Sequence, residues 1–70
     1  MVSFFERGGR FVRCETFERN DGCYELIITE PDGTQRVEVF DHSGALDDRL
    51  AQVEHDYLVA GWFGPHGLRF

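Results

Sequence analysis

The stretch CYELIITEPDGTQRVEVF, residues 23–40, places a strong turn signal between two strand-like segments. Both segments are rich in aromatic and β-branched residues, which favour extended strands. In the turn, Pro31 presets the backbone φ angle, Asp32 can accept a hydrogen bond from its own backbone, and Gly33 tolerates a left-handed conformation. We therefore predict an antiparallel hairpin with strands at about 23–30 and 34–41.

Two earlier turn signals continue this pattern toward the N-terminus. Gly8-Gly9 separates a predicted strand at 2–7 from one at 10–19, and Asn20-Asp21-Gly22 separates the latter from 23–30. Adjacent glycines readily adopt the positive φ angles of a tight hairpin. The first 41 residues are thus predicted to form a meander of four strands.

After residue 41 the apolar spacing changes from two to three and four, which is typical of an amphipathic helix. We predict this helix at about 44–61, with Ser43 as its N-cap and Gly61 at its end. Its apolar stripe is Leu46, Leu50, Val53, Tyr57 and Ala60. The remaining residues, 62–70, form an apolar tail. The predicted fold class is α+β: a single domain over 1–70, with a four-stranded antiparallel meander followed by one C-terminal helix packed on one face (ββββα).

Burial of apolar residues selects the register of the strands. It sets Cys14 opposite Ile28 and Ile28 opposite Val37, and it rejects a bulged loop at 31–33 that pairs Ile28 with Arg36. The face under the helix is then predicted to be Phe5, Val12, Cys14, Thr16, Tyr24, Leu26, Ile28, Val37 and Val39.

The other predicted face combines apolar side chains with charges of both signs, which is unusual for a face that meets only water. We predict that it is the interface of a homodimer or binds an unknown protein partner. A solvated face shielded by the apolar tail and a ligand-binding sheet are the alternatives. The predicted interface residues are Phe4, Phe11, Arg13, Glu15, Phe17, Ile27, Arg36, Glu38 and Phe40.

The order of elements over residues 2–61 resembles the repeat unit of Whirly and PUR-type single-stranded nucleic-acid binders. This resemblance implies that exposed sheet aromatics stack on bases while arginines contact phosphate. The residues available for these roles are Phe11, Phe17, Phe40, Arg7, Arg10, Arg13 and Arg36. A net charge of −6, with Glu15 and Glu38 inside the same face, repels phosphate, and nucleic-acid binding is therefore the alternative function.

No pattern in the sequence indicates catalysis, a cofactor or a metal. No serine elbow or phosphate-binding loop is present, and the histidines and cysteines lack ligand spacing. Cys14 and Cys23 are predicted on opposite faces of the sheet, which leaves them as free thiols. No signal peptide or apolar stretch of membrane-spanning length is seen, and we expect a non-enzymatic cytoplasmic bacterial protein. Whether the acidic outer face of the helix docks a partner is left open.

Overall fold

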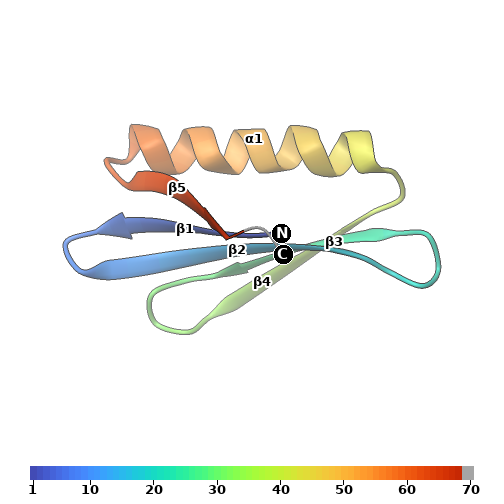
Figure 1. The fold of residues 1–70 in the computed structure, drawn as a ribbon, viewed down its shortest axis with the longest axis horizontal. Coiled ribbons are helices and arrows are strands. Elements are labelled where there is room, and N and C mark those ends of the chain that lie inside the picture. Colours follow the sequence, from blue (N-terminus) through green and yellow to red (C-terminus); the bar gives the residue numbers. More distant parts are fainter. Residues whose placement is uncertain (69–70) are drawn as a thin grey trace.

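The computed structural model describes residues 1–68 and has the element order β1(Val2–Arg7), β2(Arg10–Glu18), β3(Tyr24–Thr29), β4(Gln35–Phe40), α1(Ser43–Val59) and β5(Phe63–Leu68). The strands form one antiparallel sheet in the order β4-β3-β2-β1-β5. α1 lies over one face of this sheet (Figure 1). The predicted α+β class, with a meander followed by a packed helix, is confirmed.

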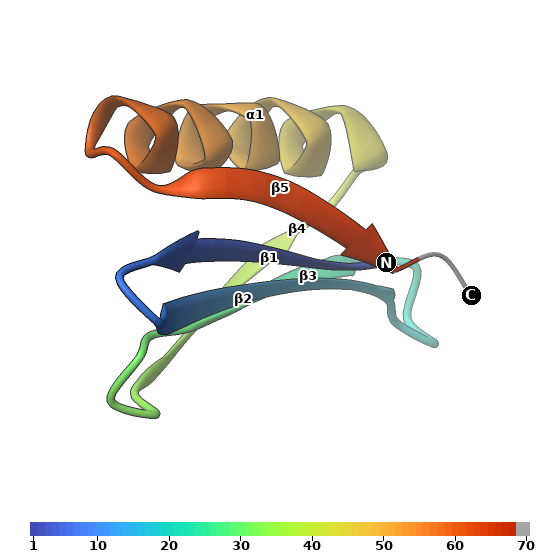
Figure 2. The same ribbon diagram turned by 60° about the vertical axis from the view of Figure 1, so that its left-hand side comes forward.

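The predicted tail contributes a fifth strand. β5 pairs antiparallel with β1 at the sheet edge opposite β4, so that α1 connects the two edge strands across one face (Figure 2). Gly64 permits this approach, because a Cβ atom on it would lie 2.6 Å from the carbonyl oxygen of Phe4. The last two residues of the predicted tail, Arg69 and Phe70, lie outside the described residues.

The register is as predicted on one side of β3 and wrong on the other. Cys14 lies opposite Ile28, but Ile28 lies opposite Arg36 and not opposite Val37. A shift of one residue turns every side chain of β4 to the other face of the sheet.

The turn at 31–33 sets this register through its backbone. Glu30 N–H donates to the Thr34 carbonyl at 2.8 Å, and Gly33 N–H donates back to the Glu30 carbonyl at 2.9 Å. Asp32 Oδ1 accepts from Thr34 N–H at 2.9 Å, and Gly33 has a φ of 88°. These bonds define a three-residue loop with a glycine bulge, one of the common hairpin connections.

The turn at 20–22 has the same geometry. Arg19 N–H donates to the Cys23 carbonyl at 2.7 Å, Cys23 N–H donates to Asp21 Oδ1 at 3.0 Å, and Gly22 has a φ of 83°. Both turns share the pair Asp-Gly, which supplies the side-chain acceptor and the left-handed residue. The same turn residues therefore form the same type of three-residue loop at both positions.

The core lies between the sheet and α1. Its fully buried members are Phe5, Val12, Cys14, Leu26 and Ile28 from the sheet, joined by Leu46 and Val53 from the helix. Burial raises the pKa of the Cys14 thiol to about 11, because the charged thiolate loses its hydration.

Aromatic rings close the core at the C-terminal end of α1. The Tyr57 ring stacks on Phe5 with centroids 5.2 Å apart, and Trp62 meets Tyr57 edge-on at 5.7 Å. Gly61 ends the helix with a φ of 89°. At the other end His42, and not Ser43, is the N-cap: its Nδ1 accepts from Ala45 N–H at 3.1 Å.

Candidate interaction surface

The surface opposite α1 is formed by alternate residues of β1–β4, because cross-strand partners share a face. We call this surface the open face. Its members are Val2, Phe4, Glu6, Phe11, Arg13, Glu15, Phe17, Glu25, Ile27, Thr29, Gln35, Val37 and Val39.

Large apolar side chains are exposed across this face. Phe11 and Phe17 are 54% and 46% exposed, and Val37 and Val39 are 53% and 52% exposed. Ile27 lies between them and is half-buried. A row of exposed apolar residues on one side of a sheet is the typical composition of a binding surface.

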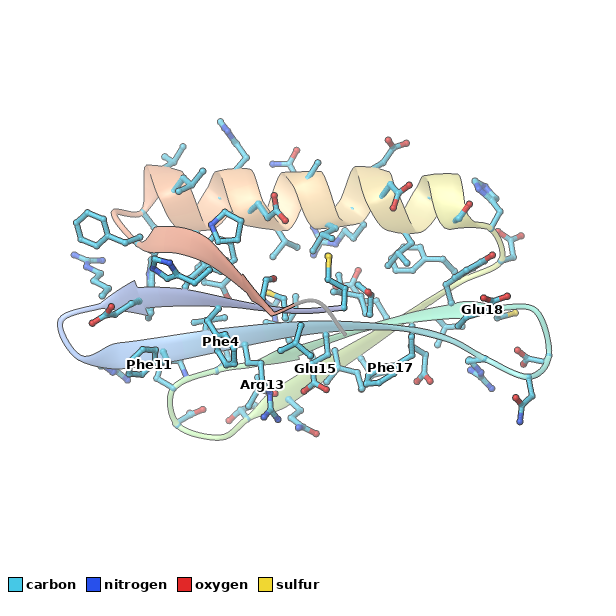
Figure 3. All side chains as sticks on the ribbon, viewed as in Figure 1. Phe4, Phe11, Arg13, Glu15, Phe17 and Glu18 are labelled. Atoms are coloured by element: carbon cyan, nitrogen blue, oxygen red, sulfur yellow. The ribbon has the colours of Figure 1, made fainter. Side chains whose placement is uncertain are left out.

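An ion pair lies at the centre of the open face. Arg13 Nε donates to Glu15 Oε1 at 2.7 Å, and the two side chains are 45% and 19% exposed. Phe11 precedes this pair and Phe17 follows it on β2, and all four side chains project from the side of the sheet away from α1 (Figure 3). β2 therefore presents Phe, Arg, Glu and Phe in succession on one face.

The structure brings six of the predicted interface residues together and removes three. Phe4, Phe11, Arg13, Glu15, Phe17 and Ile27 lie on the open face. Arg36, Glu38 and Phe40 lie on the helix side, which corrects their predicted placement. The cause is the shifted register of β4.

Each of these three side chains has a contact on the helix side. Glu38 accepts two hydrogen bonds from the Arg49 guanidinium of α1, at 2.8 and 3.2 Å, which hold the pKa of its carboxyl below the usual range. Arg36 pairs with Glu30 at 3.2 Å. Phe40 packs against the core.

Val37 and Val39 were predicted to lie under the helix, but both are exposed on the open face. The Asp-Gly turn at 31–33 was the signal that places them there, because the same residue pair at 20–22 closes a three-residue loop. The shifted register places Gln35, Val37 and Val39 on the open face in place of Arg36, Glu38 and Phe40.

The tail does not shield the open face in the part of the chain that the structure describes. Phe63–Leu68 joins the sheet beside β1 and extends its plane. A shallow hollow of about 500 Å³ remains beside Phe17 and Glu25, bounded by the turn at the end of β2. Within residues 1–68, no helix or strand covers this face from β1 to β4.

Potential metal ligands do not gather on this surface within the described residues. Among residues 1–68, no three His, Cys, Asp or Glu side chains come together as metal ligands. Cys14 is buried under α1, and Cys23 is half-buried beside its turn, both as free thiols.

A second hollow, of about 260 Å³, lies between α1 and β4 and includes Arg36, Arg49, Tyr57 and Trp62 among its lining residues. Both arginines are already paired with carboxylates. Over the described residues, no helix is both long enough and apolar enough to cross a membrane. The chain matches no protein-family model, and comparisons with curated proteins and with solved structures found no match.

Proposed function

We propose that this protein is a non-enzymatic assembly module that self-associates through its open face. The observation that carries the proposal is the half exposure of Phe11, Phe17, Val37 and Val39 on one side of a sheet whose other side is covered by α1. Burying these side chains against a partner removes apolar surface from water at about 25 cal/mol per Å². A chain of 70 residues gains from this, because small domains bury little surface on their own.

The pattern on β2 favours a second copy as the partner. A two-fold axis that passes near Cys14, parallel to the sheet and perpendicular to β2, places Phe11 over Phe17 of the second copy. The same axis places Arg13 over Glu15 of the second copy, and Glu15 over Arg13 of the second copy. The succession Phe, Arg, Glu, Phe is therefore self-complementary, as a two-fold interface requires.

The charge pair is available for such a contact. Arg13 uses Nε to reach Glu15 of its own chain, and a guanidinium has further N–H donors that can reach a second carboxylate. Face-to-face sheets pack about 10 Å apart with their side chains interdigitated. The four charges then form one cluster at the centre, bordered by aromatic rings, and fix the orientation of the two copies.

Binding of single-stranded nucleic acid is the alternative function. Phe11 and Phe17 are exposed as a stacking platform requires. Against it, the open face over β1–β4 carries Arg13 together with Glu6, Glu15 and Glu25. Arg36, predicted to contact phosphate, lies on the helix side of the sheet. Acidic side chains beside a stacking platform repel the phosphate backbone, which favours the protein partner.

Sedimentation at tens of micromolar tests self-association. We expect the native protein to sediment at no less than twice its chain mass of 8.1 kDa and Phe17→Asp at a smaller mass than the native protein. Leu58→Asp is the matched control, because Leu58 is 49% exposed but lies on α1. It should keep the native mass. A native monomer, or Phe17→Asp at the native mass, would contradict the proposal.

A further inference from the structure

The two edges of the sheet differ in their ability to accept another strand. The edge formed by β5 contains Gly64, Pro65 and Gly67, and proline lacks the N–H that a new strand would bind. The edge formed by β4 reads QRVEVF and contains neither glycine nor proline. Natural sheets usually protect such an edge, because its unpaired backbone groups invite pairing.

The hydrogen-bonding pattern identifies the free backbone groups of β4. Glu30 and Thr34 form a hydrogen-bonded pair next to the turn, and such pairs alternate along antiparallel strands. Arg36 and Glu38 therefore bond to β3, and the N–H and C=O groups of the alternate residues point outward. These residues are Gln35, Val37 and Val39, all of them exposed.

We propose that β4 of one chain pairs antiparallel with β4 of a second copy, about a two-fold axis at Val37, to form one continuous sheet. In this register Arg36 lies directly opposite Glu38 of the second copy, and Glu38 lies opposite Arg36 of the second copy. Opposite charges at facing positions stabilise a strand pair, whereas like charges destabilise it. Val37 faces its own counterpart, and Gln35 faces Val39.

The neighbouring registers are excluded by charge. An axis at residue 36 sets Arg36 against Arg36, and an axis at residue 38 sets Glu38 against Glu38. Registers shifted by one residue place the bonded groups of one strand against the free groups of the other. Arg36 and Glu38 thus disfavour pairing of this edge with most strands. They allow pairing with a second β4 in one register.

Two ion pairs within each chain lie beside this edge and can be joined by the edge contact. Glu38 is held by Arg49 at 2.8 Å, and Arg36 is held by Glu30 at 3.2 Å. Arg36 remains half exposed, with 50% of its side chain accessible. Pairing of the edges joins these two contacts into a line from Arg49 through Glu38 to Arg36 and Glu30 of the second copy, in which each charge has opposite neighbours.

The edge contact is independent of the contact through the open face. Its axis is perpendicular to the sheet, whereas the axis near Cys14 lies parallel to it, so that one chain can make both contacts at once. A chain that uses both contacts has one neighbour at each of them. A chain that uses the edge alone forms a dimer.

Disulfide trapping tests the register. We expect Val37→Cys to form a covalent dimer under a mild oxidant, because the two Cα atoms at the axis are about 5.5 Å apart, within disulfide range. Val39→Cys is the matched control: Val39 is as exposed as Val37 and lies on the same face, but in this register it lies about 14 Å from its counterpart. Both variants carry Cys23→Ser, while Cys14 is buried.

The same trapping in chains that also carry Phe17→Asp separates this inference from the proposed function. We expect Val37→Cys to remain trapped there, and Phe17→Asp alone to sediment as a dimer. Equal trapping of the two cysteine variants, or trapping of neither, would overturn the edge contact and leave the open-face contact standing. A native mass that Phe17→Asp leaves unchanged, together with trapping of Val37→Cys, would overturn the open-face contact and retain the edge.

Discussion

Arg13→Glu and Glu15→Arg each leave charges of one sign at the centre of the open face. If the two-fold axis passes near Cys14, Arg13→Glu sets a new carboxylate over Glu15 of the second copy. Glu15→Arg sets two guanidinium groups over each other in the same way. Each variant therefore repels itself, but a mixture of the two variants restores opposite charges at every contact.

The magnitude follows from the exposure of the pair. Two unit charges about 5 Å apart interact by about 1.7 kcal/mol at an effective dielectric constant of about 40, a value between protein surface and water. This dielectric constant is appropriate because the Arg13 and Glu15 side chains are 45% and 19% exposed. Symmetry repeats the contact, so the repulsion amounts to about 3 kcal/mol, or roughly 150-fold in Kd. The lost attraction adds little, because exposed pairs contribute at most about 1 kcal/mol.

Sedimentation equilibrium of each variant and of their equimolar mixture measures this effect. We expect the Kd of the open-face contact to rise roughly 150-fold in each variant alone and to return close to the native value in the mixture. Far-UV circular dichroism and thermal unfolding of each variant control for the fold. Association in the mixture no tighter than in either variant alone would refute the axis near Cys14, even if the native protein self-associates.

Three further predictions concern reactivity, close packing and ligand choice. At pH 8 we expect a thiol reagent to label Cys23 in the native state and Cys14 only after unfolding, because burial raises the pKa of Cys14 to about 11; two labels in the native state would contradict this. Gly64→Ala should lower the free energy of unfolding by about 1–3 kcal/mol, since its Cβ would lie 2.6 Å from the Phe4 carbonyl oxygen. Gly67→Ala, where a Cβ meets nothing within 4 Å, should lower it by less than about 0.5 kcal/mol in the same thermal unfolding assay. Fluorescence anisotropy should show no tight binding of single-stranded DNA or RNA near physiological salt, and a micromolar Kd that weakens steeply with salt would support the alternative function.

Local sequence patterns were enough to predict the first four strands, the helix and most of the core. Turn residues at 8–9, 20–22 and 31–33 placed the meander, and the spacing of Leu46 and Val53 placed the helix. Such signals are local, because a turn residue or an apolar repeat acts within a few positions of the chain. Phe11, Arg13, Glu15 and Phe17 were found on the open face for the same reason, since alternation along one strand needs no partner.

The register of β4 and the pairing of β5 depend on contacts that form only in the folded chain. Burial favoured Val37 under the helix, but the backbone bonds of the loop at 31–33 set Arg36 opposite Ile28. The core tolerates this arrangement because Arg49 of α1 pairs with Glu38 and because Phe40 fills space beside the core. These contacts join residues of different elements, and local sequence patterns do not predict them.

The place of β5 was likewise decided by tertiary contacts. The sequence predicted an apolar tail at 62–70, and the glycine and proline residues of this segment give no strand signal. β1 offered an unpaired edge, and Gly64 allowed its backbone to approach Phe4 closely enough to pair. Local sequence sets which strands and helices can form; which edges meet, and hence which faces remain open, depends on backbone hydrogen bonds formed across the whole chain.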